Sequence, residues 1–206
     1  MPSIYTLKPR FQNLLRPIVN GLARIGITAN QITVTALLLS LGAGFLIAWA
    51  RGGRMLLLLP IVLLLRMALN AMDGMLAREH NQVSALGAIL NELGDVVSDI
   101  GLYLPLGLVP GFDARLVVAV VILSTLTEMT GVVAVQIGAS RRYDGPFGKS
   151  DRAFLFGMMG LLLGCGVPIE RAIPYALLVM IFLLLLTIFN RARHALKQVS
   201  ANGERQ

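Results

Sequence analysis

The sequence carries little charge for its length. Only 14% of its 206 residues are Asp, Glu, Lys or Arg, whereas about 25% is usual for a soluble domain. Hydrophobic residues make up 56% of the chain, in several runs close to the roughly 20 residues that a helix needs to cross a bilayer. This composition excludes an ordinary soluble enzyme and predicts a single integral membrane domain over residues 1–206.

Cysteine is also nearly absent, because Cys165 is the only one and it lies in an apolar run. A disulfide framework is therefore excluded. The net charge of +7 does not indicate nucleic-acid binding, since the basic residues gather at the ends of apolar segments.

The apolar runs predict an all-α polytopic protein with six transmembrane helices in a bundle over residues 32–190. The spans cover residues 32–50, 55–77, 85–108, 114–139, 153–167 and 173–190. Residues 4–25 carry apolar and basic positions at helical spacing, which predicts an amphipathic helix lying in the membrane interface. Residues 140–152 are expected to form a basic loop, and residues 191–206 a polar cytoplasmic tail.

Basic residues are divided unevenly between the two sides of such a bundle. Six spans place both termini on one side, where thirteen Lys and Arg residues fall, against four on the other side. The positive-inside rule therefore predicts that both termini face the cytoplasm. The thirteen are Lys8, Arg10, Arg16, Arg24, Arg78, Arg141, Arg142, Lys149, Arg152, Arg191, Arg193, Lys197 and Arg205.

Acidic and amide residues concentrate in residues 70–99, where the second and third spans meet. A carboxylate at membrane depth costs roughly 2.5–3.5 kcal/mol, so acids retained there need a partner. Asn70 and Asp73 share one helix face, and Asn91, Asp95 and Asp99 share a face of the next helix. The short connection makes the two helices antiparallel neighbours whose polar faces converge. Their oxygen atoms suit Mg²⁺ or another hard divalent cation.

Small residues lie beside these polar positions, namely Gly74, Ala77, Gly87 and Gly94. Small side chains allow two helices to approach closely in a membrane, and they also leave room for a ligand against the backbone. Their spacing leaves both interpretations open. Glu128, inside the fourth span, is a further functional candidate because of its depth.

Residues 70–95 read N-x2-D-G-x2-A-R-x8-G-x3-N-x3-D. This pattern resembles the signature of the CDP-alcohol phosphotransferase family, D-x2-D-G-x2-A-R-x8-G-x3-D-x3-D. The spacing agrees throughout, and six of the eight fixed positions agree in residue type. The segment TANQIT, which begins at Thr28 and signals a helix start, is similar to the family's Pro-Asn-x-x-Thr element.

The resemblance implies a transferase that moves a substituted phosphate from a CDP-linked donor to an alcohol and releases CMP. By position, Asp73 is a metal ligand, and Asp95 is a metal ligand and the general base. Asn70 and Asn91 replace the first and third aspartates, and their amide oxygens can still bind a hard cation. The two lost charges predict weaker metal binding or one ion in place of two.

Asp99, one turn beyond Asp95, is expected to compensate as a further metal ligand. The alternative is that Asp99 contacts another helix, near Arg66 or Glu128. The resemblance also assigns nucleotide binding to four residues, Gly74, Ala77, Arg78 and Gly87.

The basic loop resembles, at Gly148-Lys149, an element that many bacterial family members carry before the fifth span. Lys149, Arg152 and Arg141 are therefore expected to bind the acceptor. Flanking positive charge alone is the alternative explanation for these residues.

These observations predict an inner-membrane enzyme that uses CDP-diacylglycerol, Mg²⁺ or Mn²⁺, and a polar alcohol. The basic loop favours glycerol 3-phosphate as the acceptor, while inositol phosphate, another polyol and a phospholipid headgroup stay open. Its active site is expected to face the cytoplasm, and the resemblance implies a homodimer. Two alternatives remain: a degenerate relative that only binds nucleotide or lipid, and an ion transporter. The transporter is less favoured, because the sequence has no related halves.

Overall fold

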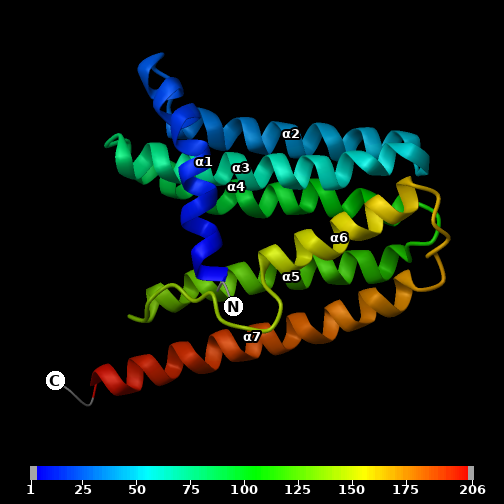
Figure 1. Cartoon of the computed structure of the whole chain (residues 1–206). Helices are drawn as coiled ribbons and strands as arrows, with labels where there is room; N and C mark the ends of the chain where they lie inside the picture. The colour runs from blue at the N-terminus through cyan, green and yellow to red at the C-terminus, as the bar shows by residue number, and fades with distance from the viewer. Residues whose placement is uncertain (1–3, 204–206) are drawn as a thin grey trace.

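The computed structural model describes residues 4–203, with side chains from Arg10 to Asn202, and it contains helices but no strands over that range. Figure 1 shows α2 to α7 running roughly along one axis, with α1 crossing them. The α-helices are α1 (Ile4–Arg24), α2 (Ala29–Ala50), α3 (Leu58–Glu79), α4 (Ala85–Tyr103), α5 (Ala114–Gln136), α6 (Lys149–Gly164) and α7 (Ile173–Gly203). Two short 3-10 helices, η1 (Gly53–Leu57) and η2 (Leu104–Leu108), precede α3 and follow α4.

Each of the six predicted spans corresponds to a helix of the structure. Four helical segments are long and apolar enough to cross a membrane, namely Ala29–Ala50, Gly53–Glu79, Ala114–Gln136 and Ile173–Asn202. The other two helices are α4, which has 19 residues and includes three carboxylates, and α6, which has 16 residues. The three carboxylates of α4 and the short length of α6 set these two helices apart from the other four.

The start of α2 confirms the helix signal at Thr28. The Thr28 hydroxyl accepts a hydrogen bond from the Gln31 backbone N–H at 3.3 Å, and the Gln31 side chain accepts one from the Thr28 N–H at 2.9 Å. This reciprocal pair is a capping box, which satisfies donors that a helix N-terminus leaves free.

The predicted end of the basic loop is wrong. The loop expected to end at Arg152 ends earlier, because α6 already begins at Lys149, where the Asp151 carboxylate accepts a hydrogen bond from the Gly148 N–H at 2.7 Å. The segment predicted to be a cytoplasmic tail continues α7 as a helix as far as Gly203, because it contains good helix formers and Ala195 packs against Ala134 and Ala139. Residues 204–206 of that tail, and the side chains of Lys8 and Arg205, lie outside the described parts.

α2 packs against both α3 and α4, and it comes closest to α4 at Gly44. A Cβ at Gly44 would lie 1.8 Å from the backbone oxygen of Gly101, so the two helices touch through their backbones. The backbones of α3 and α4 approach each other much less closely than either approaches α2. The space between α3 and α4 is therefore bridged by long polar side chains, and this is where the predicted site lies.

Candidate functional site

Asn70 on α3 and Asp95 on α4 meet directly. The Asn70 amide donates a hydrogen bond from Nδ2 to Asp95 Oδ1 at 3.0 Å. The Lys149 ammonium also contacts Asp95 Oδ1, and the Arg66 guanidinium lies 3.4 Å from the same oxygen. No hydrogen bond reaches Asp95 Oδ2 from the side chains described between residues 10 and 202. The two predicted polar faces thus converge, and one Asp95 oxygen is held while the other is open.

A cavity of about 510 Å³, here called the signature cavity, lies between α2, α3 and α4 and is bordered by α1. Seven of its lining residues belong to the signature, namely Asn70, Asp73, Gly74, Ala77, Arg78, Gly87 and Asn91. All four residues expected to bind the nucleotide are therefore gathered around one space. Of the small residues considered above, Gly74, Ala77 and Gly87 border this cavity.

The glycines of the signature cavity let polar side chains lie against the backbone. A Cβ at Gly74 would lie 3.0 Å from Arg78 Nη2, and one at Gly87 would lie 2.8 Å from Asn30 Oδ1. Asp73 is anchored from α2, because its Oδ2 accepts a hydrogen bond from Thr33 Oγ1 at 2.9 Å. Asn30 and Thr33, which the sequence placed only in a helix-start element, therefore form a wall of the cavity.

The donors around the signature cavity fit a hard cation in part. Asp73 supplies carboxylate oxygens, and Asn70 and Asn91 can supply amide oxygens, all suited to Mg²⁺ or Mn²⁺. Asp95, which was expected to share this ion, contacts Asn70 but is not among the residues that line the cavity. Within residues 4–203 no three His, Cys, Asp or Glu side chains are grouped to hold a metal by themselves. An ion at this site must therefore complete its shell with amide groups and with oxygens of a ligand.

A second cavity, here called the α3–α6 cavity, has a volume of about 530 Å³. Its lining is mostly apolar, with Leu63, Met67 and Phe154 among the residues that form its walls. Its polar lining residues include Arg66, Asn70, Asp99 and Lys149. Asn70 borders both cavities, so a polar space and an apolar space adjoin at the residue that contacts Asp95.

Asp99 faces away from the signature cavity and contacts two arginines. Its Oδ1 accepts a hydrogen bond from Arg66 at 2.6 Å, and its Oδ2 accepts one from Arg152 at 3.0 Å. Both oxygens of this buried carboxylate are thus bound to guanidinium groups, as in the alternative that placed Asp99 against another helix. Asp99 lines the α3–α6 cavity together with Asn70. It does not line the signature cavity with Asp73 and Asn91, with which it was expected to share a metal.

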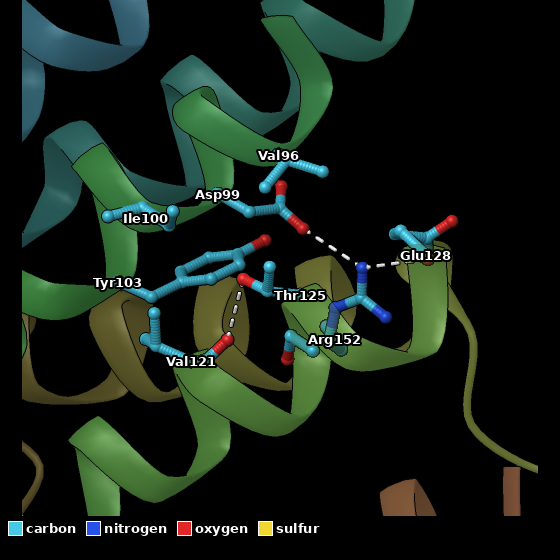
Figure 2. A pocket seen from close by; sticks show the side chains of 9 residues that line it. Val96, Asp99, Ile100, Tyr103, Val121, Thr125, Glu128 and Arg152 are labelled. Atoms are coloured by element: carbon cyan, nitrogen blue, oxygen red, sulfur yellow. Dashed lines mark hydrogen bonds and ion pairs between the residues drawn. The ribbon is translucent and has the colours of Figure 1, made fainter. Parts of the chain in front are cut away.

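Glu128 on α5 is the centre of a second group of charges. Its carboxylate lies 3.2 Å from Arg152, 3.5 Å from Arg141 and 3.5 Å from Arg191. Figure 2 shows the Arg152 guanidinium lying between Asp99 and Glu128. Sequence reasoning named Glu128 by depth but gave it no partner, and it counted Arg191 only as flanking charge.

The three residues expected to bind the acceptor are differently placed. Lys149 lies 31% exposed beside Asp95, Arg141 forms a 2.7 Å ion pair with Glu92, and Arg152 is fully buried. In the loop before α6, partial burial would raise the pKa of Asp144. The hydrogen bonds and charge of Arg142 outweigh it and hold that pKa below its ordinary value.

Comparison with known proteins matches residues 26–200 to the CDP-alcohol phosphatidyltransferase family. The chain is 55% identical to the inner membrane protein YnbA of Escherichia coli over 159 residues, 77% of this chain and 79% of that protein. It is 33% identical to an archaetidylinositol phosphate synthase of Pyrococcus horikoshii over 93 residues, 45% of this chain and 47% of that protein.

Solved structures share the fold. The phosphatidylinositol phosphate synthase of Mycobacterium tuberculosis with CDP-DAG bound superposes with a TM-score of 0.71 at 20% identity, covering 89% of this chain and 92% of that one. The same enzyme in complex with manganese and citrate gives a TM-score of 0.74 at 20% identity and covers 87% of both chains. With seven of the eight signature positions gathered at one cavity and nearly its whole length matched, the chain belongs to the CDP-alcohol phosphatidyltransferase family, a family of transferases.

Proposed function

We propose that this protein transfers a phosphatidyl group from CDP-diacylglycerol to a polar alcohol and releases CMP. The observation that carries the proposal is the junction of the two cavities at Asn70. A donor with a nucleotide diphosphate and acyl chains needs a polar and an apolar space at one place. The M. tuberculosis enzyme of the same fold, crystallised with CDP-DAG bound, supports this choice of donor.

The signature cavity suits the nucleotide diphosphate. Arg78 lies against Gly74 there, and no carboxylate of residues 10–202 forms an ion pair with it. An unpaired guanidinium is a strong partner for phosphate oxygens. The apolar walls of the α3–α6 cavity suit an acyl chain, which reaches them sideways from the bilayer.

The metal supplies charge neutralisation at the donor diphosphate when it is bound. Asp73, with the amide oxygens of Asn70 and Asn91, would hold it, and the loss of two signature carboxylates favours one ion. Mg²⁺ and Mn²⁺ both suit this oxygen set.

Asp95 is the proposed base. Lys149, Asn70 and Arg66 hold its Oδ1, which leaves Oδ2 to accept the proton of the acceptor hydroxyl. The acceptor oxygen then bonds to the phosphorus that carries diacylglycerol. The bond from that phosphorus to the bridging oxygen breaks, and CMP leaves with the electron pair.

The proposed topology has α2 to α7 all crossing the inner membrane, with both termini and the signature cavity facing the cytoplasm. The uneven count of basic residues supports this orientation. α4 and α6 carry charges, but the contacts of Asp99 with Arg66 and Arg152 offset their cost inside the bundle. Considered by sequence alone, the basic residues at positions 141–152 favour glycerol 3-phosphate as the acceptor.

The test is CMP release by the purified full chain in lipid nanodiscs with CDP-diacylglycerol, Mg²⁺ or Mn²⁺ and a panel of alcohols. We expect release that depends on the alcohol and falls at least ~100-fold in Asp95→Asn, as for loss of a general base. Asp113→Asn is the matched control. Asp113 is the N-cap of α5 and lies away from the site, and Asn preserves that cap. Retained CDP-diacylglycerol binding without CMP release would identify a binding protein and overturn the proposal.

A further inference from the structure

Two hydrogen bonds, one helical turn apart, join α3 to α4. Arg66 on α3 donates to Asp99 Oδ1 on α4 at 2.6 Å, and Asn70, one turn later on α3, donates to Asp95 Oδ1 at 3.0 Å. The pairs run in opposite directions along the two helices, as they must for antiparallel neighbours, and each helix presents its two residues on one face. In both pairs α3 supplies the donor and α4 supplies the acceptor.

The chemistry of the side chains fixes the direction of the bond between Asn70 and Asp95. An ionised carboxylate only accepts hydrogen bonds, so the group that faces Asp95 Oδ1 is the NH₂ of Asn70 and not its carbonyl oxygen. The signature has an aspartate at this position. A carboxylate there would place an acceptor against another acceptor in a half-buried position, where water offsets the repulsion only in part.

The two asparagines of the signature are therefore not equivalent. Both border the signature cavity. Asn70 is half-buried and bonds to Asp95, whereas Asn91 is exposed and forms no hydrogen bond with a side chain described between residues 10 and 202. The missing carboxylate at position 91 only removes a ligand, but the one at position 70 also creates a donor that faces the proposed base.

From this difference we infer that Asn70 is a positioning residue, whose amide holds Asp95 where two carboxylates would need a shared cation. The inference rests on the proposed function and gives Asn70 a role in it besides metal binding. Lys149 contacts the same oxygen of Asp95, and Arg66 donates to the Asp95 backbone oxygen at 2.9 Å. These contacts hold Oδ1 and leave Oδ2 open, so the base is oriented by donors of the chain itself.

Asn70→Asp tests the direction of this hydrogen bond, because it turns the donor into an acceptor of nearly the same volume. In detergent with a metal chelator, we expect the melting temperature to fall by about 4 °C or more, since two carboxylates then face each other inside the bundle. Asn91→Asp is the matched control. It adds the same charge on the same helix as Asp95 but at an exposed position, so its loss is expected to be about 2 °C at most. A loss in Asn70→Asp no larger than in the control overturns the inference.

Combining Asn70→Asp with Asp95→Asn reverses the pair, so that α4 supplies the donor and α3 the acceptor. We expect this double variant to regain about half or more of the melting temperature lost in Asn70→Asp, whereas independent sites would simply add their losses. If Asn70→Asp alone does not fold, recovery of folded protein in the double variant measures the same pairing. A double variant no more stable than Asn70→Asp contradicts the inference.

The CMP-release assay separates positioning from metal binding. Asn70→Asp is expected to lower kcat about tenfold with a smaller change in the KM for CDP-diacylglycerol, because the base is displaced while the donor cavities remain. A residue that was only a lost ligand would give an equal or higher kcat when its acid is restored. That outcome overturns the inference and leaves the proposed function standing. Absence of CMP release from the unaltered protein overturns the proposed function and, with it, the role of Asn70 in catalysis.

Discussion

Asp99 on α4 accepts a 2.6 Å hydrogen bond from Arg66 on α3, and its second oxygen is bound by Arg152 on α6. One buried carboxylate therefore ties three helices together. Arg66 also donates to the backbone oxygen of Asp95 at 2.9 Å, so it contacts two successive turns of α4. The position of the proposed base thus depends on charges that do not border the signature cavity.

Replacing Asp99 by Ala should strongly reduce stability. It leaves two buried guanidinium groups short of a partner, and breaking a buried pair costs about 3 kcal/mol at the lower end of the usual range. The lower end applies because, in the variant, Arg152 still has Glu128 as an ion-pair partner and Arg66 still has Asp95. Unfolding in mild detergent measures this change.

The control for Asp99→Ala is Glu79→Ala. It breaks the ion pair with Arg16, whose two side chains are 45% and 37% exposed, and such pairs are worth less than about 1 kcal/mol. Equal losses of stability in the two variants would show that Asp99 does not hold the helices together.

The spacing of the signature predicted most of the residues that share a cavity, although Asp95 is not among them. A fixed pattern over residues 70–95 specifies faces of two helices, and the structure gathers Asp73, Arg78, Gly87 and Asn91 around one space. The start of α2 was also readable, because a capping box is a local interaction.

The partners of Asp99 could not be read from the sequence. Helical periodicity specifies the face of α4 on which Asp99 lies, but Arg152 comes 53 residues later and belongs to a helix whose start was misplaced. Glu128 likewise contacts Arg191, which is distant in sequence, so this partner could not be predicted either. Contacts between distant helices depend on packing that local patterns do not encode.

Restoring the third signature acid should strengthen metal binding. Asn91 borders the signature cavity, and Asn91→Asp adds a second carboxylate to a lining that already includes Asp73. One added charge near a divalent ion is expected to tighten Mn²⁺ binding about tenfold. Electron paramagnetic resonance of free Mn²⁺ measures this without substrate. Asn202→Asp, at the exposed end of α7, is the control, and equal affinity in the two variants would argue against a metal at this cavity.

The contact between α2 and α4 should tolerate no added methyl group at Gly44. A Cβ there would lie 1.8 Å from Gly101 O, whereas a Cβ at Gly42 would meet no atom within 4 Å. Gly44→Ala must push the helices apart, at a cost of about 3 kcal/mol. Gly42→Ala, in the same helix, should change stability by no more than about 1 kcal/mol, in the stabilising direction. Thermal unfolding of the two variants distinguishes these outcomes, and similar melting temperatures would contradict the packing.

Filling the α3–α6 cavity should weaken binding of the lipid donor without affecting its nucleotide. Met67 borders this cavity from α3 and is 53% exposed, whereas Leu65, which is 49% exposed, is not part of its lining. Met67→Trp is expected to raise the KM for CDP-diacylglycerol about tenfold, because the larger ring would occupy space that the acyl chain is proposed to fill, and overfilling costs about 1–3 kcal/mol. Leu65→Trp adds the same ring on another face of α3 and should leave that KM unchanged. Binding of free CDP should be equal in both variants, because the nucleotide is proposed to lie in the signature cavity. A loss of CDP binding in Met67→Trp alone would contradict the proposed placement of nucleotide and acyl chain in separate cavities.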